Sequence, residues 1–356
     1  MKWRRHVDQR RLLVAAAAFA AAAGVATALT LPVPYVIISP GPVFNTLGEY
    51  RGNPVIDITG TTTYPTTGEL DMTTVRERGG PYGPLTAVEA VAAYVRDQSA
   101  VLPRELLFPD DESSQQSKDR SAADFDTAQA NAVAAALGEL GIPVSEAPLV
   151  VTVIAEGPSE GILEPNDVIV AVAGQPVSTS QSAVDAIRAQ PIGATIPLTI
   201  KRDDTTLEVE VVSAPNPTDP TVGYIGVSLQ PTYEAPFDID FTLDGVGGPS
   251  AGLIFSLAII DQLTPEQLTN GQQVAGTGTI TPTGEVGAIG GIKQKMIAAK
   301  ESGAVLFLAP EANCGQVVGN EPEGLTVAAV ATLDEALTAL GEFQAGRSVK
   351  GCGTSV

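Results

Sequence analysis

The sequence predicts a mixed α+β protein in which one N-terminal transmembrane helix precedes the folded parts. Three observations predict this class. Residues 12–31 form an uncharged apolar run, residues 148–214 contain β-branched strands between glycine and proline turns, and residues after 222 alternate strand and helix patterns. With 356 residues, 44% of them apolar, the chain can form two or three domains with cores of their own.

The apolar run at residues 12–31 has 20 uncharged positions, ten of them alanine. As a helix it would span roughly 30 Å, the thickness of a bilayer core. Residues 1–11 carry a net charge of about +4, and the remaining residues carry about −25. Because basic residues stay inside, we expect a single-pass protein of the cell membrane with residues 1–11 in the cytoplasm and the rest outside it. A signal peptide cleaved near Ala26–Ala28 is the alternative.

The composition also limits the partners. The negative charge repels nucleic acid, and the sequence has no basic patch with interleaved aromatic residues. A zinc site needs about four ligands, but the chain offers two cysteines and one histidine, His6. We therefore expect no nucleic acid, no metal and no other cofactor. Cys314 and Cys352 could form a disulfide that holds the C-terminal tail, or remain two free thiols.

Residues 32–145 begin as an extended, proline-rich segment and continue with strand and helix patterns. In one helix pattern, Val88, Val91, Ala92 and Val95 share one apolar face, as in an amphipathic helix. A polar loop precedes the second helix pattern. The predicted elements are strands at 55–58 and 69–75, helices at 85–95 and 125–140, and the loop at 103–122.

Residues 148–214 differ in texture. Strands at 149–154 and 168–172 flank a turn at Pro165-Asn166-Asp167, and a short helix and two further strands follow. This order resembles a bacterial PDZ domain, with Asn166-Asp167 where Gly-Asp is commoner. The resemblance implies a β-rich domain with short helices at residues 146–214, which binds an extended or C-terminal peptide by strand addition.

Ser250 is the candidate nucleophile. It lies in Gly-Gly-Pro-Ser-Ala-Gly, residues 247–252, before an apolar run that predicts a helix. The glycines allow close backbone approach, and the N–H groups of a helix start suit an oxyanion hole near Gly248, Pro249 and Ala251. A serine that merely caps the helix is the alternative. Because His6 is the only histidine, a Ser-His-Asp triad is disfavoured, and a lysine is the remaining base.

Lys293 is the candidate general base. Its neighbours in Gly-Ala-Ile-Gly-Gly-Ile-Lys, residues 287–293, are small or apolar, and the nearest carboxylate along the chain is Glu285. Burial lowers the pKa of a lysine and can make it a base near neutral pH. We expect Lys295, which points about 200° around the helix from Lys293, to be a surface residue, together with Lys300.

The two motifs together resemble the proteolytic domain of Lon proteases. The segments Pro249-Ser250-Ala251-Gly252 and Gly290-Gly291-Ile292-Lys293 match its nucleophile and lysine motifs, with serine and lysine 43 positions apart, and residues 277–281 match an intervening strand. The resemblance implies a Lon-type α/β domain at residues 222–345, with Ser250 as nucleophile, Lys293 as base and Thr277 orienting the amine. Val246-Gly247 replaces the family's Lys-Asp pair, and Thr279 replaces its glutamate.

The whole chain resembles the membrane-anchored, PDZ-containing Lon-like serine proteases of bacteria. The sequence has no G-x-x-x-x-G-K-[ST] motif, so no P-loop ATPase is expected. The resemblance implies an ATP-independent serine endopeptidase that cleaves proteins or peptides outside the cytoplasm through an acyl-enzyme, as a homo-oligomer of the hexameric kind common in Lon-type domains. The alternatives are a non-catalytic PDZ adaptor of the envelope on a degenerate Lon-like scaffold, and a Ser-Lys amidase or signal-peptidase-like enzyme.

The protease domain is predicted to be split. Only 28 residues separate Val222 from Ser250, too few for the strands and helix that begin a Lon-type domain, whereas the strands near 55–75 and the helix at 85–95 have the right order and type. We predict that residues 69–75 share a sheet with a strand at 274–280 and that the PDZ domain is inserted between them. The predicted organisation is a cytoplasmic tail (1–11), a transmembrane anchor (12–31), an N-terminal segment contributing to the protease domain (32–145), the PDZ domain (146–214), the Lon-type domain (222–345) and a tail (346–356).

Overall fold

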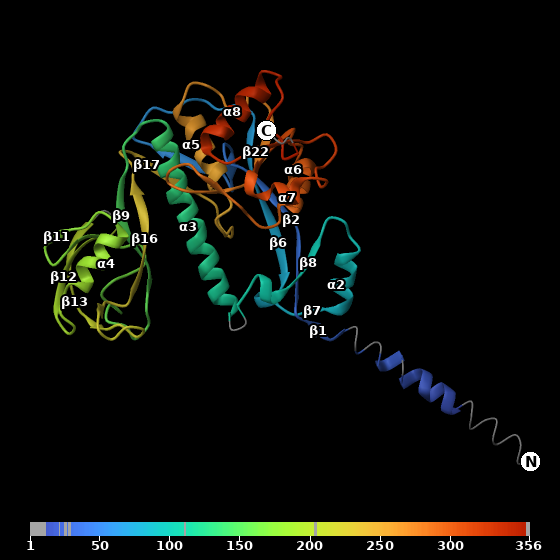
Figure 1. Cartoon of the computed structure of the whole chain (residues 1–356), viewed down its shortest axis with the longest axis horizontal. Coiled ribbons are helices and arrows are strands. Elements are labelled where there is room, and N and C mark those ends of the chain that lie inside the picture. Colours follow the sequence, from blue (N-terminus) through green and yellow to red (C-terminus); the bar gives the residue numbers. More distant parts are fainter. Residues whose placement is uncertain are drawn as a thin grey trace, which may run out of the picture.

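The computed structural model describes residues 12–20, 22–24, 27, 30–109, 112–202 and 205–353. Figure 1 shows two folded units, with the long helix α3 (Ser114–Glu139) between them. The predicted tail at 1–11 lies outside the described residues, and the predicted anchor at 12–31 is described only in part, as helix at most of those positions. In the part of the chain that the structure describes, no helix is both long and apolar enough to cross a bilayer.

The larger unit is built on a six-stranded sheet in the order β22-β21-β18-β6-β2-β8. The first four strands are parallel to one another, and β2 and β8 are antiparallel additions at one side. The strands are β2 (Tyr35–Asn45), β6 (Glu69–Gly79), β8 (Ala100–Pro103), β18 (Gln273–Gly276), β21 (Leu306–Pro310) and β22 (Thr326–Val330).

This sheet joins segments that are about two hundred residues apart. Strand β6 pairs in parallel with β18, from Glu69 beside Gln273 to Met72 beside Gly276. The pairing predicted between residues 69–75 and the strand near 274 is therefore present. The expected strand at 274–280 is interrupted at Thr277 and resumes as β19 (Thr279–Ile280), which pairs with β20 (Val286–Gly287).

Helices cover both faces of the sheet. On one face lie α3, α5 (Gly252–Leu263) and α8 (Leu333–Gln344), packed on Leu70, Met72 and other apolar strand residues. Residues Gly252–Asp261 of α5 are all buried, as expected of a helix that is apolar on all sides. The other face carries α6 (Ile292–Ser302) and α7 (Cys314–Val317) over Ala275 and Phe307. Cys314 and Cys352 form a disulfide between α7 and the C-terminal tail.

The smaller unit is an antiparallel sheet in the order β13-β12-β10-β9-β16, with its own apolar core. Its edge strand β16 comes after the proline-rich segment at 215–220, in residues that were predicted to belong to the protease domain. The structure differs from that prediction, because β16 pairs with β9 and completes the sheet of the smaller unit. The elements are β9 (Ser145–Val153), β10 (Val168–Val172), β11 (Gln175–Pro176), α4 (Ser180–Arg188), β12 (Thr195–Arg202), β13 (Thr205–Val212) and β16 (Val227–Glu234).

Two segments of the N-terminal part differ from prediction. Helix α3 begins at Ser114, inside the predicted loop, because Ser113 and Gln116 form a capping box. Helix α2 (Ala87–Tyr94) is present, but Val88, Val91 and Val95 face solvent. The remaining elements are β1 (Pro32–Val33), β3 (Glu49–Tyr50), β4 (Asn53–Pro54), β5 (Ile56–Thr59), β7 (Leu85–Thr86), β14 (Ala214–Pro215), β15 (Gly223–Tyr224), β17 (Asp238–Phe241), and the 3₁₀ turns η1 (Gly80–Tyr82), η2 (Arg104–Leu106) and η3 (Glu311–Asn313).

Candidate active site

Ser250 lies two residues before α5, in a loop that is bonded to the break between β18 and β19. The Thr277 hydroxyl and the Gly278 N–H both donate to the Ser250 carbonyl oxygen, each at 2.9 Å. The loop is close-packed, since a Cβ added at Gly252 would lie 2.7 Å from Ile280 Cγ2. These contacts fix the backbone of Ser250, while its side chain remains partly accessible.

Lys295 on α6 reaches Ser250. Its Nζ lies 2.6 Å from Ser250 Oγ and 2.9 Å from Thr277 Oγ1, and only 2% of the residue is exposed. Ile292, Met296 and Ala299 are buried on α6 with it. Positions 292, 295, 296 and 299 follow the i, i+3, i+4, i+7 spacing of one helix face. Lys295 therefore belongs to the core-facing side of α6.

Burial changes the acid–base chemistry of Lys295. Removal of the ammonium group from water lowers its pKa from 10.5 to about 7. A lysine with a pKa of 10.5 is neutral in only about one molecule in three thousand at pH 7, whereas a pKa of about 7 leaves about half neutral. The neutral amine can accept a proton from Ser250 Oγ at its present distance.

Lys293 is not part of this cluster, and its assignment as the base is corrected. Its Nζ forms a 2.9 Å ion pair with Asp97, a fully solvated carboxylate, and its own side chain is partly exposed. The two lysines are two residues apart on one helix, so they point about 200° away from each other. The apolar neighbours of Lys293 along the chain were misleading, and the helical spacing from Ile292 to Met296 would have identified Lys295.

Gly291 determines where α6 starts. It has φ +69° at the helix N-cap, a left-handed conformation that favours glycine, and a Cβ there would lie 2.7 Å from Val75 Cγ1 of β6. The first turn of α6 can therefore lie directly against the sheet. The Lys295 N–H donates to the Gly291 carbonyl, so the glycine also fixes the turn that carries the lysine.

Thr277 lies where it was predicted, against the amine of a lysine, although that lysine is Lys295. Its hydroxyl has one proton, which it donates to the Ser250 carbonyl. The oxygen is therefore available as an acceptor for Lys295 Nζ. One threonine thus holds both members of the pair.

The three oxyanion candidates differ in what their backbone can donate. The Gly248 N–H already donates to the Ser121 carbonyl of α3 at 2.8 Å. Pro249 has no N–H. Among the described residues, no backbone carbonyl accepts a hydrogen bond from the Ala251 N–H, which lies at the start of α5. Ala251 is therefore the candidate oxyanion donor. The prediction that Gly248 and Pro249 also donate is corrected.

No metal centre is evident in the described ranges, where no three His, Cys, Asp or Glu side chains are grouped to hold an ion. Both cysteines are in the disulfide.

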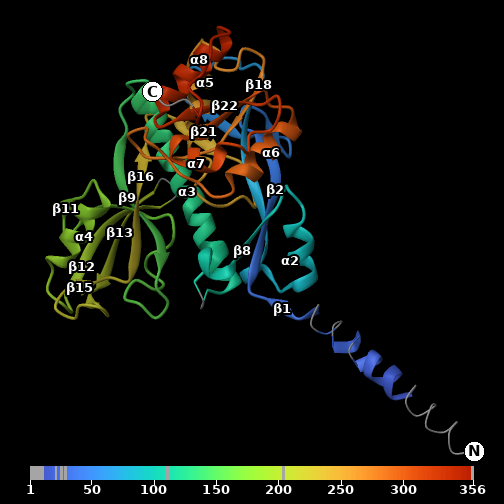
Figure 2. The same ribbon diagram turned by 45° about the vertical axis from the view of Figure 1, so that its right-hand side comes forward.

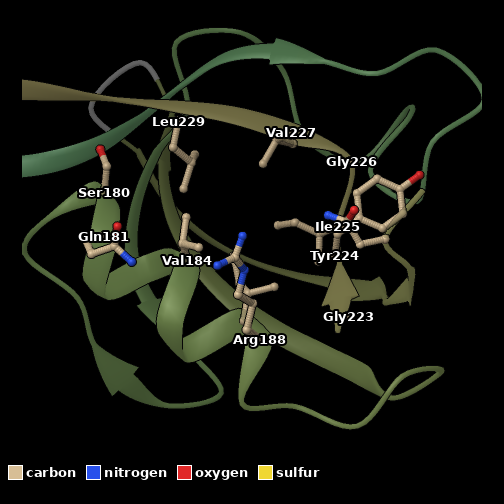
Figure 3. A pocket seen from close by; sticks show the side chains of 12 residues that line it. Ser180, Gln181, Val184, Arg188, Gly223, Tyr224, Ile225, Gly226, Val227 and Leu229 are labelled. Carbon is tan, nitrogen blue, oxygen red and sulfur yellow. The ribbon is translucent and has the colours of Figure 1, made fainter. Parts of the chain in front are cut away.

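Apart from the cluster of Ser250, Thr277 and Lys295, a hollow of about 300 Å³ lies in the smaller unit, between α4 and the edge strand β16. In Figure 3, Val184 of α4 and Leu229 of β16 point toward each other across it, and Arg188 of α4 also lines it. Among the strands that the structure describes, none lies beside the outer edge of β16, so an extended peptide could pair there. Farther along β16, Gln230 accepts a hydrogen bond from Thr127 of α3 at 2.5 Å.

Comparison with known families matches two parts of the chain. Residues 245–341 match the Lon protease (S16) C-terminal proteolytic domain, and residues 138–212 match the PDZ domain. The first range includes Ser250, Thr277 and Lys295. The second range begins eight residues before the predicted start of the PDZ domain at residue 146 and ends two residues before its predicted end at residue 214.

Among curated relatives, a Lon protease of Lachnoclostridium phytofermentans is 41% identical over 93 residues, 25% of this chain and 11% of that protein. Lon protease 1 of Bacillus subtilis is 31% identical over 118 residues, 31% of this chain and 15% of that protein. The chain thus matches only a small part of these relatives' length.

Among solved structures, the PDZ domain of an SdrC-like protein of Listeria monocytogenes is 22% identical with a TM-score of 0.22, covering 23% of this chain and 85% of that one. The solution structure of GtR34C of Geobacillus thermodenitrificans is 35% identical with a TM-score of 0.21, covering 22% of this chain and 92% of that one.

Proposed function

We propose that this chain, which carries a PDZ domain and a Lon-type proteolytic domain, is a serine endopeptidase in which Ser250 is the nucleophile and Lys295 the general base. The 2.6 Å contact between Lys295 Nζ and Ser250 Oγ, within a buried site that lowers the lysine pKa to about 7, carries the proposal. A helix cap would not need a buried lysine at this distance, so the contact favours chemistry over a structural role for the serine.

The proposed reaction uses these groups in order. Ser250 Oγ attacks a peptide carbonyl carbon, and its proton moves to neutral Lys295 Nζ. The oxyanion is held at the Ala251 N–H, with the positive end of α5 behind it. The C–N bond then breaks as the Lys295 ammonium gives its proton to the leaving amine, which leaves an acyl-Ser250. Water, deprotonated by Lys295, attacks the ester and frees the second product, and the proton returns to Ser250.

We propose that the PDZ groove selects or positions the substrate. The edge of β16 would pair with an extended segment, and the hollow beside α4 would take an apolar side chain. Helix α3 lies against β16 through Thr127 and against the Ser250 loop through Ser121. A peptide held on β16 would therefore lie across one helix from the nucleophile loop.

The proposed location is outside the cytoplasm, with residues 12–31 as a retained membrane anchor. The basic residues before that run support this orientation. The Cys314–Cys352 disulfide supports an oxidising compartment. ATP-independence is proposed because the chain has no P-loop motif.

The test compares the full-length chain in detergent with three variants on an unfolded protein substrate, without ATP. Ser250→Ala and Lys295→Ala should lose at least about a hundredfold in kcat/KM. The matched control Lys293→Ala removes a lysine of the same helix and should cleave as the wild type does. The wild-type rate should rise through about pH 7 and then level, as Lys295 loses its proton.

Two results would overturn the proposal. One is a Lys295→Ala variant that cleaves normally while Lys293→Ala does not. The other is a wild type that never cleaves yet binds peptides at the β16 groove, which would leave a peptide-binding adaptor on an inactive scaffold.

A further inference from the structure

Helix α2 presents an apolar face to solvent. Val91, Tyr94 and Val95 are 63%, 79% and 78% exposed, and Val88 is half exposed. The side of the helix that faces the protein carries small residues, with Ala93 buried and Ala90 partly buried against Ile37 and Leu85. An apolar helix face normally packs on the core, so this orientation is inverted.

The place of α2 in the fold is as informative as its orientation. Strand β1 pairs with β7, so Pro32 lies beside Thr86 and Val33 beside Leu85. Thr86 is the N-cap of α2. The apolar run ends at Leu31, directly before strand β1, and β1 pairs with the residues at the start of α2. Figures 1 and 2 both show α2 beside the point where the N-terminal helical segment joins the folded unit.

We propose that α2 lies on the outer surface of the bilayer, with Val88, Val91, Tyr94 and Val95 in the headgroup region. This inference rests on the proposed anchoring of the chain by residues 12–31. If those residues span the bilayer, the β1–β7 pairing holds the start of α2 near the level where the chain leaves the lipid. Aliphatic and tyrosine side chains on one face suit this depth.

Charge is consistent with this surface. Glu89, the acidic residue within α2, is paired with Arg78 at 2.6 Å, and Asp97 just beyond the helix is paired with Lys293. The acidic groups beside the apolar face are thus compensated within the protein.

The same contacts connect this surface to the catalytic helix. Asp97 binds Lys293 near the start of α6, and the Gln98 amide donates to Glu301 near its end at 2.9 Å. The helix that carries Lys295 is therefore held to the segment after α2 at both ends. With α2 on the bilayer, α6 would keep a fixed height above it.

The test places an environment-sensitive NBD label on single added cysteines in the full-length chain reconstituted into lipid vesicles. Both native cysteines are in the disulfide, so the added thiol is the one available for labelling. The labelled variants are Val91→Cys and Val95→Cys. The matched control is Val212→Cys, a valine 55% exposed on β13 of the PDZ domain. Both ribbon views place strand β13 far from α2.

We expect labels at 91 and 95 to shift to blue emission and to be quenched several-fold by lipids carrying a shallow doxyl group, with no change at 212. Flotation with the vesicles after alkaline washing is measured first. A chain that does not float refutes the anchor and the inference with it. A chain that floats with aqueous labels at 91 and 95 refutes the inference alone. A blue shift without doxyl quenching also overturns it, because a second copy of the chain would then cover α2.

Discussion

Replacement of Lys295 by methionine should remove activity and increase stability together. In the wild type, folding moves the lysine from water, where its pKa is 10.5, to a buried site where its pKa is about 7. Each unit of pKa shift corresponds to about 1.4 kcal/mol, so burial of the charged form costs at most about 4–5 kcal/mol. Methionine has a similar length and carries no charge, so the Lys295→Met variant avoids this cost.

The pH dependence of the gain has a definite sign. Between about pH 7 and 10.5 the unfolded chain holds the lysine proton and the folded chain does not, so the free energy of unfolding of the wild type rises with pH. Below pH 7 the lysine is charged in both states and its cost is fully present. The advantage of Lys295→Met should therefore be greatest at pH 6 and shrink steadily toward pH 10.

The assay is urea unfolding of the full-length wild type and variant in detergent at pH 6, 8 and 9.5, with cleavage measured in parallel. The control is Lys293→Met, which removes an exposed ion pair worth about 0–1 kcal/mol and should change neither quantity strongly. A Lys295→Met variant less stable than the wild type at pH 6, or one that still cleaves, would refute the reasoning.

Three further changes have expected outcomes. Burial raises the pKa of Asp71 to about 6, so Asp71→Asn should raise the free energy of unfolding above pH 6 by up to about 3 kcal/mol, with no gain below pH 4 in urea titrations. Cys352→Ser opens a loop of 38 residues and should lower the melting temperature with a loss of about 4 kcal/mol, equal to that of the reduced wild type. Gly291→Ala forces a Cβ against Val75 at positive φ and should lower cleavage and stability together, whereas Gly290→Ala, with open space around its Cβ, should affect both less.

The sequence allowed much of the site to be predicted, and the errors have physical causes. Ser250 was predicted from its glycine-containing motif and Thr277 from the resemblance to Lon proteases, and both lie beside a lysine amine as expected. Lys293 was wrong because polarity was judged along the chain, whereas burial on a helix follows a 3.6-residue period. The partner of Thr277 is the lysine in phase with Ile292 and Met296.

The fold, too, could be predicted from the sequence only in part. The parallel pairing of β6 with β18 could be predicted, since residues after 222 were too few to begin the domain alone. The place of β16 in the PDZ sheet could not, because the proline-rich segment before it looks like a boundary and the pairing partner β9 is distant in sequence. The orientation of α2 could not be predicted either, because valine and alanine residues make both faces of this helix apolar.

The PDZ insertion also has a consequence for the order of folding. The six-stranded sheet cannot close until β18 has been made, about two hundred residues after β6, and closure of so long a loop is slow. The smaller unit has its own core, and the pairing of β9 with β16 brings Ser145 beside Glu234, so once folded it shortens the loop between the two halves. The PDZ domain should therefore fold first and hold the two halves of the larger unit close together. A variant that destabilises its core should delay the appearance of proteolytic activity during refolding.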